Sequence, residues 1–133
     1  MTLSSASDYW TDYFSEERSN VSVFIPDGYW YPYFGDNYEV CSIDGKPGLV
    51  GGIRCKGRYC DNISLECIQP YKNKAGQWYP VTKVNNCQWS GWYSEEQGSV
   101  DFGYQRYITG VECNGSYCDN KRFYVCSLVD PAP

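Results

Sequence analysis

The chain has 133 residues with a formal net charge of −5, a length that suits one domain with a modest core. The acidic balance excludes nucleic acid as the expected partner, because neutralising phosphates requires clustered Lys and Arg. No apolar stretch approaches the ~18 residues that a membrane-spanning helix needs, so we expect no membrane span.

The cysteine and histidine counts indicate the redox compartment of the protein and limit the metal sites that it could form. The chain contains eight Cys and no His. An even number of cysteines in a short chain is typical of disulfides formed in an oxidising compartment. Zinc is the competing explanation, but His ligands are absent and the C-x4-C spacing is wider than in a zinc knuckle. We therefore expect a secreted, extracellular protein whose leader is absent from this chain.

Short alternating stretches recur along the chain, as half-buried strands require. In chain order they are residues 21–25, 63–67, 100–104 and 123–128. In the last stretch Phe123 and Val125 fall on one face, and Tyr124, Cys126 and Leu128 fall on the other. Gly-containing turns separate the stretches, and Leu and Ala are scarce. These patterns predict an all-β, disulfide-stapled small domain of short antiparallel strands.

Two segments carry nearly the same cysteine-containing motif. Residues 52–67 read GIRCKGRYCDNISLEC, and residues 110–126 read GVECNGSYCDNKRFYVC. Upstream, a Trp and Ser-Glu-Glu pattern at residues 10–18 recurs at 89–97. The two offsets are 58 and 79 residues, which places an insertion of 79 − 58 = 21 residues in the first copy.

We therefore predict that residues 1–133 form one domain built from two pseudo-twofold-related repeats. Repeat 1 spans residues 10–67 and contains an aromatic insertion at about 26–46. Residues 68–86 form a linker, and repeat 2 spans residues 87–126.

The duplication narrows the choice of disulfide pairs. Each repeat contains a C-x4-C loop that one bond would close, and each needs one further cysteine from outside the motif. We favour four bonds within the repeats: Cys55–Cys60, Cys113–Cys118, Cys41–Cys67 and Cys87–Cys126. The alternative joins the repeats through Cys41–Cys87 and Cys67–Cys126, and the sequence leaves it open.

Aromatic residues make up 18% of the chain, more than so small a domain can bury. The insertion concentrates six of them in one segment: Tyr29, Trp30, Tyr31, Tyr33, Phe34 and Tyr38. Exposed rings beside polar groups suit sugars, and Tyr and Trp also dominate protein interfaces. We predict these six as ligand-binding residues, with a lid over the core as the structural alternative.

Catalysis has few candidates in this chain. The absence of His excludes Ser-His-Asp and Cys-His mechanisms. Paired carboxylates of a glycoside hydrolase remain, at Glu16-Glu17 and Glu95-Glu96. Adjacent residues of a strand face opposite ways, however, so neither pair is well placed to act together. We therefore predict that the protein is not an enzyme.

The repeated Tyr-Cys-Asp-Asn segment raises the question of calcium. Asp61 or Asp119 could join a Glu of the same repeat as oxygen ligands. An Asx turn that caps backbone amides explains the same residues without a metal. We expect no cofactor, with calcium as the alternative.

Four parts of repeat 2 resemble the repeat of the dermatopontin family, which includes invertebrate haemagglutinins: residues 89–102, 108–111, 119–120 and 123–126. They match its Trp-Ser opening, Gly-Val strand, Asp-Asn turn and closing aromatic strand with Cys. The G-x-x-C-x-G-x-Y-C-D-N motif also resembles tandem modules of secreted proteins. The Glu-Asp-Arg signature of the family is absent after the turn, and the C-x4-C loop is foreign to it. The resemblance implies extracellular adhesion or sugar binding.

Together these features predict a secreted, non-enzymatic binding module, lectin-like or adhesive. Its expected partner is a glycan or a cell-surface protein. One alternative is a secreted toxin, effector or inhibitor that binds a protein target through the same aromatic loop. Another is a small glycoside hydrolase that uses the paired Glu residues.

Overall fold

The computed structural model describes residues 23–24, 29–35, 37–56, 62–94, 106–114 and 120–131. These residues form β-strands and no helix, so the predicted all-β class is confirmed. All strand pairs in the described residues are antiparallel. No helix that could cross a membrane is found in this part of the chain.

The strands are β1 (Val23–Phe24), β2 (Tyr29–Trp30), β3 (Tyr38–Val40), β4 (Ser42–Ile43), β5 (Lys46–Pro47), β6 (Leu49–Lys56), β7 (Asn62–Ile68), β8 (Tyr71–Lys74), β9 (Gln77–Pro80), β10 (Val84–Trp89), β11 (Tyr93–Ser94), β12 (Tyr107–Asn114) and β13 (Asn120–Leu128).

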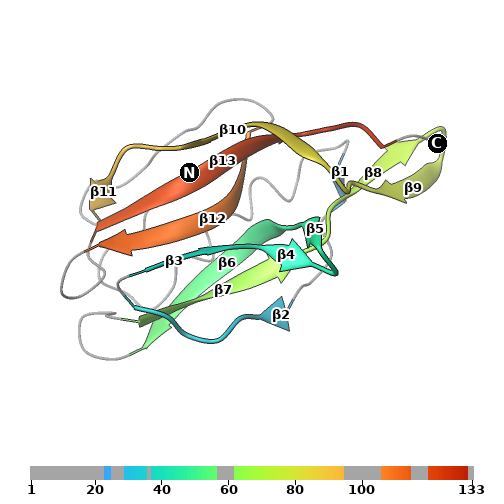
Figure 1. Cartoon of the computed structure of the whole chain (residues 1–133). Helices are drawn as coiled ribbons and strands as arrows, with labels where there is room; N and C mark the ends of the chain where they lie inside the picture. Colours follow the sequence, from blue (N-terminus) through green and yellow to red (C-terminus); the bar gives the residue numbers. More distant parts are fainter. Residues whose placement is uncertain are drawn as a thin grey trace.

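Two sheets face each other as the layers of a β-sandwich (Figure 1). The larger sheet has five strands in the order β10-β13-β12-β3, with β11 also paired to β13. The smaller sheet has the order β2-β7-β6. A further sheet, β1-β8-β9, lies at one end of the sandwich, and β4 and β5 form a two-stranded hairpin.

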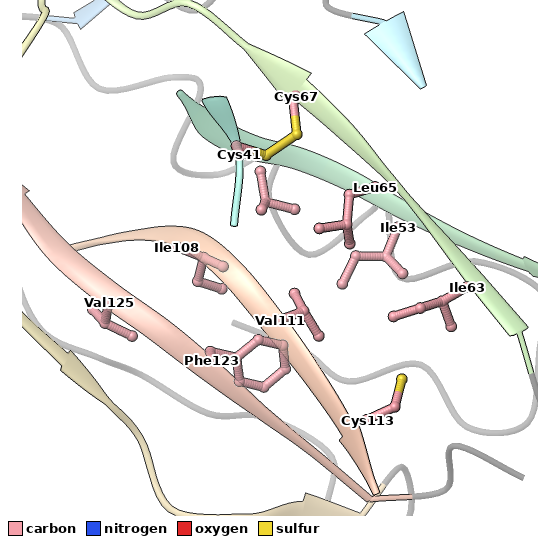
Figure 2. Close-up of a cluster of buried hydrophobic side chains, with 11 residues drawn as sticks. Cys41, Ile53, Ile63, Leu65, Cys67, Ile108, Val111, Cys113, Phe123 and Val125 are labelled. Carbon is pink, nitrogen blue, oxygen red and sulfur yellow. A yellow bond between two sulfur atoms is a disulfide. The ribbon is translucent and has the colours of Figure 1, made fainter. Parts of the chain in front are cut away.

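Buried side chains from both sheets fill the space between the layers (Figure 2). Since alternate residues of a strand face opposite sides, each long strand supplies every second residue to this core. Eight of these side chains are at most 1% exposed: Cys41, Ile53, Ile63, Leu65, Cys67, Ile108, Val111 and Phe123. The sequence groups Phe123 with Val125 on one strand face and predicts alternation along residues 63–67, and the structure shows that Ile63, Leu65, Cys67, Phe123 and Val125 point inward.

The β6–β7 and β12–β13 hairpins share one pairing pattern. Equivalent residues differ by 110 − 52 = 58 positions, and each hairpin has a register shift at the same place, before Gly52 and before Gly110. The cross-strand pairs are Gly52–Glu66 and Ile53–Leu65 in one hairpin, and Gly110–Tyr124 and Val111–Phe123 in the other. Equal registers are what a duplicated hairpin would produce, and the duplication itself stays a prediction from the sequence.

A Trp lies on the edge strand beside each hairpin. Trp30 of β2 pairs with Glu66 of β7, and Trp89 of β10 pairs with Tyr124 of β13. Because Glu66 and Tyr124 are themselves equivalent, Trp30 occupies the place in its sheet that Trp89 occupies in the other. Trp10, the partner of Trp89 in the sequence alignment, lies outside the described residues.

The chain after each Trp follows the same path. Equivalent contacts are the hydrogen bonds from Tyr31 N to Leu65 O and from Ser90 N to Phe123 O, both 2.8 Å, and the pairings Phe34–Ile63 and Tyr93–Lys121. Residues 30–34 therefore run along the edge of one sheet as residues 89–93 run along the edge of the other. The segment predicted as part of an insertion has, in its strand pairing, a counterpart in the second half of the chain.

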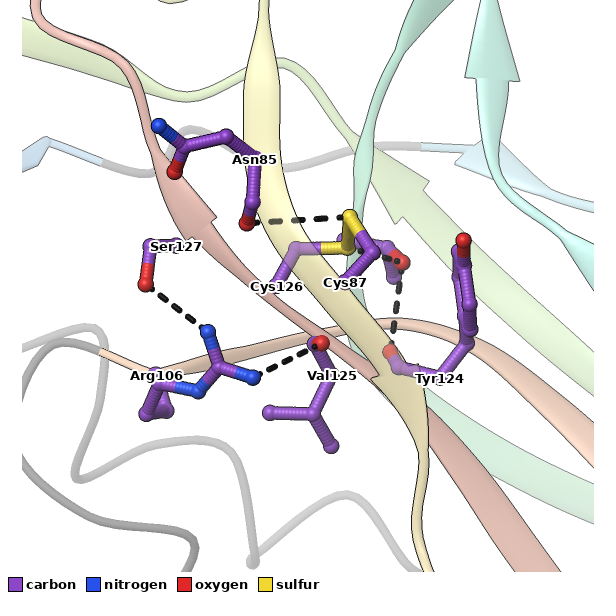
Figure 3. The surroundings of a disulfide bond; sticks show 8 residues. Asn85, Cys87, Arg106, Tyr124, Val125, Cys126 and Ser127 are labelled. Carbon is purple, nitrogen blue, oxygen red and sulfur yellow. Dashed lines mark hydrogen bonds between the residues drawn. A yellow bond between two sulfur atoms is a disulfide. The ribbon is translucent and has the colours of Figure 1, made fainter.

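Two disulfides lie within the described residues. Cys41 is bonded to Cys67 and Cys87 to Cys126, with Cα–Cα distances of 5.5 and 4.1 Å. These are two of the four pairs within the repeats that the sequence favours. The Cys41–Cys67 bond belongs to the core (Figure 2), whereas Cys126 lies on the outward side of β13, where Cys87 meets it from β10 (Figure 3).

The C-x4-C loops are described only in part. Cys113 is buried and disulfide-bonded, and none of the described cysteines is free. Cys60 and Cys118, the predicted partners of Cys55 and Cys113, lie outside the described residues. The pairings Cys55–Cys60 and Cys113–Cys118 therefore stay predictions.

Residues 68–86, predicted to link the repeats, contain the β8–β9 hairpin and the beginning of β10. Val81, which follows this hairpin, is 1% exposed, and its backbone oxygen accepts a hydrogen bond of 2.6 Å from Gln69 Nε2. Lys72 of β8 forms an ion pair with Asp130, and its hydrogen bond and charge lower the pKa of the Asp130 carboxyl. The β8–β9 hairpin is thus held at its base by the Gln69–Val81 hydrogen bond and held to the C-terminal segment by the Lys72–Asp130 ion pair.

The β8–β9 hairpin turns at Ala75-Gly76, with φ angles of 52° and 86°. A type I′ turn requires positive φ at both central residues, a conformation that costs Ala about 1 kcal/mol more than Gly or Asn. We expect Ala75→Asn to raise the free energy of unfolding by about 0.5–1 kcal/mol in urea titrations. Asp44→Asn is the matched control, because the β4–β5 turn already has the favoured Asp-Gly sequence and should change little. An Ala75→Asn protein no more stable than wild type would contradict this reading of the turn.

Candidate ligand-binding face

The outward side of the larger sheet carries a hollow of about 450 Å³. Its lining residues come from β3, β10, β12 and β13, and are Tyr38, Val40, Trp89, Glu112, Arg122 and Tyr124. On β13, Arg122 and Tyr124 alternate with the buried Phe123 and so face outward. Strand pairing places Glu112 opposite both Arg122 and Tyr38. The hollow is therefore a direct product of sheet register.

Three aromatic rings form one side of the hollow. The rings of Tyr38 and Trp89 meet edge to face, with centroids 6.1 Å apart and planes at 84°. Trp89 and Tyr124 lie 5.0 Å apart with planes tilted by 41°. Edge-to-face and offset arrangements are the favourable ones for aromatic pairs, so each ring helps to hold the next. Tyr38 is nevertheless 57% exposed and presents an apolar surface to solvent.

An ion pair lies among these rings. Arg122 Nε donates a hydrogen bond of 2.6 Å to Glu112 Oε1, and the two side chains are 33% and 25% exposed. The Arg122 guanidinium also lies 5.0 Å from the ring centroids of both Trp89 and Trp92. Cation–π attraction to two indoles, which an ordinary surface ion pair lacks, adds to this ion pair. The result is a fixed array of N–H donors and carboxylate oxygens beside apolar rings.

Gly110 allows β3 to approach β12 closely enough to complete the hollow. A Cβ atom at this position would lie 2.8 Å from Glu39 O and 2.8 Å from Val40 Cγ2. No side chain fits at these distances, so a larger residue would push β3 outward. Since Tyr38 is the first residue of β3, the glycine sets how close this ring comes to Trp89.

The outward side of the smaller sheet carries a second aromatic group, which we call the Arg54 face. It consists of Trp30, Tyr33, Arg54 and Lys56. The Arg54 guanidinium lies 4.4 Å from the Trp30 ring centroid and 5.7 Å from that of Tyr33. Lys56 Nζ lies 4.5 Å from the Tyr33 ring centroid.

Of the six aromatic residues predicted as one binding loop, the structure places five side chains, and it distributes them over three places. Tyr31 and Phe34 pack against the core, which matches the structural alternative of a lid. Trp30 and Tyr33 belong to the Arg54 face. Tyr38 alone lines the hollow. The backbone of Tyr29 pairs with Cys67, and its side chain lies outside what the structure describes.

Five lining residues are not among those predicted as ligand-binding: Val40, Trp89, Glu112, Arg122 and Tyr124. The sequence carries one signal for them, since the alternation of β13 places Tyr124 on the face opposite Phe123. It does not show which strands lie beside β13, and those neighbours supply Glu112 and Trp89.

The candidate catalytic and calcium-binding residues cannot be placed with the hollow. Glu16, Glu17, Glu95, Glu96, Asp61 and Asp119 all lie outside the described residues. Within the described part of the chain, no group of three or more His, Cys, Asp or Glu could hold a metal ion.

No family model matches this chain, and no curated protein or solved structure matches it either. The resemblance to the dermatopontin family stays a prediction. The molecule is therefore classified by its own architecture, as a disulfide-bonded antiparallel β-sandwich with an aromatic, ion-paired hollow on one outer face.

Proposed function

We propose that the protein is a secreted, non-enzymatic carbohydrate-binding module and that the hollow is its binding site. The observation that supports this most is the presence of three contacting aromatic rings and the hydrogen-bonded Arg122–Glu112 pair in one hollow. A volume of about 450 Å³ falls within the roughly 300–1,000 Å³ that is usual for small-ligand sites.

The chemistry of the hollow suits a sugar ring. The C–H face of a pyranose packs on the aromatic rings of Trp89 and Tyr124. The guanidinium of Arg122 donates to sugar hydroxyls, and the carboxylate of Glu112 accepts from them. Since the two charges compensate each other, the hollow favours a neutral sugar over an anionic one.

A protein target is the alternative partner for the same surface. Trp, Tyr and Arg are the residues that most often contribute binding energy in protein interfaces. Tyr38 and Trp92, which are 57% and 41% exposed, extend the aromatic surface beyond the floor of the hollow. A toxin, effector or inhibitor would use them against a flat epitope.

Loss of the Tyr38 ring tests the proposed site. We expect the wild-type protein to bind members of an array of neutral hexose oligosaccharides, and Tyr38→Ala to weaken binding of the best of these about 10-fold in calorimetric titrations. Glu112→Gln should weaken it to a similar extent, because the hydroxyl acceptor and the partner of Arg122 both change.

Trp78→Ala is the matched control, since Trp78 on β9 is 47% exposed and lies away from the hollow. It should leave the affinity unchanged, and thermal unfolding should show that all variants remain folded. Absence of binding to every neutral oligosaccharide, or equal losses for Tyr38→Ala and Trp78→Ala, would refute the proposal. Capture of a protein target whose binding is lost in Tyr38→Ala would favour the alternative.

A further inference from the structure

We propose that the Arg54 face is a second binding site and that it takes an anionic saccharide, whose sugar rings carry carboxylate or sulfate groups. This inference rests on the proposed function in that it assigns sugar binding to both outer faces. It depends on different residues and on a ligand of different charge, so the two proposals can fail separately.

The Arg54 face and the hollow have equivalent aromatic rings in the strand pairing of the two sheets, whereas Arg54 takes the place of Glu112 and Ser64 the place of Arg122. In each sheet an arginine is stacked between two aromatic side chains that lie three residues apart on the edge segment. The corresponding rings are Trp30 and Tyr33 on one face, and Trp89 and Trp92 on the other. Both outer faces therefore present the same combination of apolar rings and a guanidinium.

The two faces differ in how the arginine charge is compensated. Arg122 lies opposite Glu112 and is hydrogen-bonded to it, whereas Arg54 lies opposite Ser64. The Ser64 hydroxyl donates to the backbone oxygen of Tyr31, and it carries no negative charge that could compensate Arg54. Arg54 Nε is buried, and the described residues provide no hydrogen-bond partner for it.

A second cation strengthens this asymmetry. Lys56 is exposed and lies next to the Tyr33 ring, two residues along β6 from Arg54 and therefore on the same face. Glu66, opposite Trp30, is the acidic residue at this end of the face, and it already has an interaction of its own. Two cations beside two rings thus lack the cross-strand carboxylate that the hollow contains.

An anionic sugar satisfies this arrangement better than a neutral one. Carboxylate and sulfate oxygens form charge-assisted hydrogen bonds with guanidinium and ammonium groups, and such bonds are about twice as strong as neutral ones. The net charge of −5 repels anions at long range, but salt screens it beyond about 8 Å at physiological ionic strength. The local cations of Arg54 and Lys56 then decide which ligand binds.

Two sites on opposite outer faces of one sandwich would let a single chain bridge two glycans. Bridging on a surface that displays many copies raises the effective affinity without any new contact. The two faces would also select different sugars, one neutral and one acidic.

The test is calorimetric titration of the full chain in 50 mM NaCl with two anionic probes, a heparin-derived hexasaccharide and a hexamer of galacturonate. We expect Arg54→Gln/Lys56→Gln to weaken binding of the anionic probe at least 10-fold. The matched control Lys46→Gln/Lys83→Gln removes the same number of charges from exposed lysines elsewhere and should stay within about 2-fold of wild type. Lys56→Gln alone, which changes only an exposed side chain, should weaken binding several-fold even if Arg54→Gln disturbs folding.

The two anions are distinguished by comparing the probes. Preference for the heparin fragment assigns the site to sulfate, and equal binding of the galacturonate hexamer assigns it to carboxylate. Binding of neither probe, or equal losses in the Lys46/Lys83 control, would overturn the second site. Tyr38→Ala should leave anionic binding intact, so loss of neutral binding alone in that variant supports both proposals. Anionic binding without any neutral binding would refute the hollow and leave the second site standing.

Discussion

Replacing Phe123 with Ala is expected to lower the free energy of unfolding by about 3–5 kcal/mol. Phe123 is 0% exposed and lies between the two sheets. Its ring centroid is 6.2 Å from the ring centroid of Tyr93. Truncation leaves a cavity that neither rigid sheet can close, so the loss includes contacts as well as hydrophobic burial. Urea unfolding monitored by fluorescence measures the difference.

The neighbouring residue supplies the control for this prediction. Tyr124 follows Phe123 on β13 but faces outward into the hollow. Tyr124→Ala should cost clearly less stability than Phe123→Ala and should weaken ligand binding, whereas Phe123→Leu should recover most of the lost stability. If Tyr124→Ala proved as destabilising as Phe123→Ala, the assignment of inner and outer faces would be wrong.

Removal of the Cys41–Cys67 disulfide as Cys41→Ala/Cys67→Ala is expected to cost about 2–4 kcal/mol. Both cysteines are at most 1% exposed and belong to the hydrophobic core. The variant loses the restraint on the unfolded chain over a separation of 26 residues, and it also loses sulfur atoms packed between the sheets. Urea unfolding of the double variant under oxidising conditions measures the loss.

The second disulfide makes this prediction discriminating. Cys87–Cys126 spans 39 residues, so chain entropy alone makes it worth about 0.4 kcal/mol more than Cys41–Cys67. We expect the opposite order, because neither Cys87 nor Cys126 belongs to the hydrophobic core between the sheets, although Cys126 itself is buried. A Cys87→Ala/Cys126→Ala protein less stable than the Cys41/Cys67 variant would show that loop length dominates over packing.

The outer disulfide has a second expected effect, on binding. It joins β10 to β13 two residues before Trp89 and two residues after Tyr124, so it fixes the strands that carry these rings (Figure 3). Arg106 reinforces the same region through hydrogen bonds of 2.8 Å to Ser127 Oγ and 3.1 Å to Val125 O. Neutral-sugar affinity should therefore fall in the Cys87/Cys126 variant and change less in the Cys41/Cys67 variant.

Several features of this fold follow from local sequence rules. Alternation along residues 63–67 and 123–128 predicts which side chains share a face, because successive residues of any strand face opposite sides whatever surrounds it. The Asp44-Gly45 turn is readable for a similar reason, since few residues adopt positive φ. The pairs Cys41–Cys67 and Cys87–Cys126 follow from a different rule, which is the count of cysteines within each repeat.

The candidate site was much less predictable. The aromatic loop was expected to act as a unit, yet its rings lie in the core, on the Arg54 face and in the hollow. In an extended strand successive side chains diverge, so clustering along the chain does not imply clustering in space. The match between residues 10–18 and 89–97 has the same weakness. Trp10 corresponds to Trp89 in the sequence pattern, whereas Trp30 corresponds to Trp89 in the strand pairing.

By itself, the sequence determined that this protein is an all-β, disulfide-bonded chain, and it grouped the alternate residues of 63–67 and 123–128 on common strand faces. These properties depend on backbone geometry and on cysteine number, both of which act locally. Only the tertiary structure decided that Tyr38, Trp89, Glu112 and Arg122 share one hollow and that Arg54 lacks a cross-strand carboxylate. Such neighbours are set by sheet order and register, which arise from contacts between residues far apart in the chain.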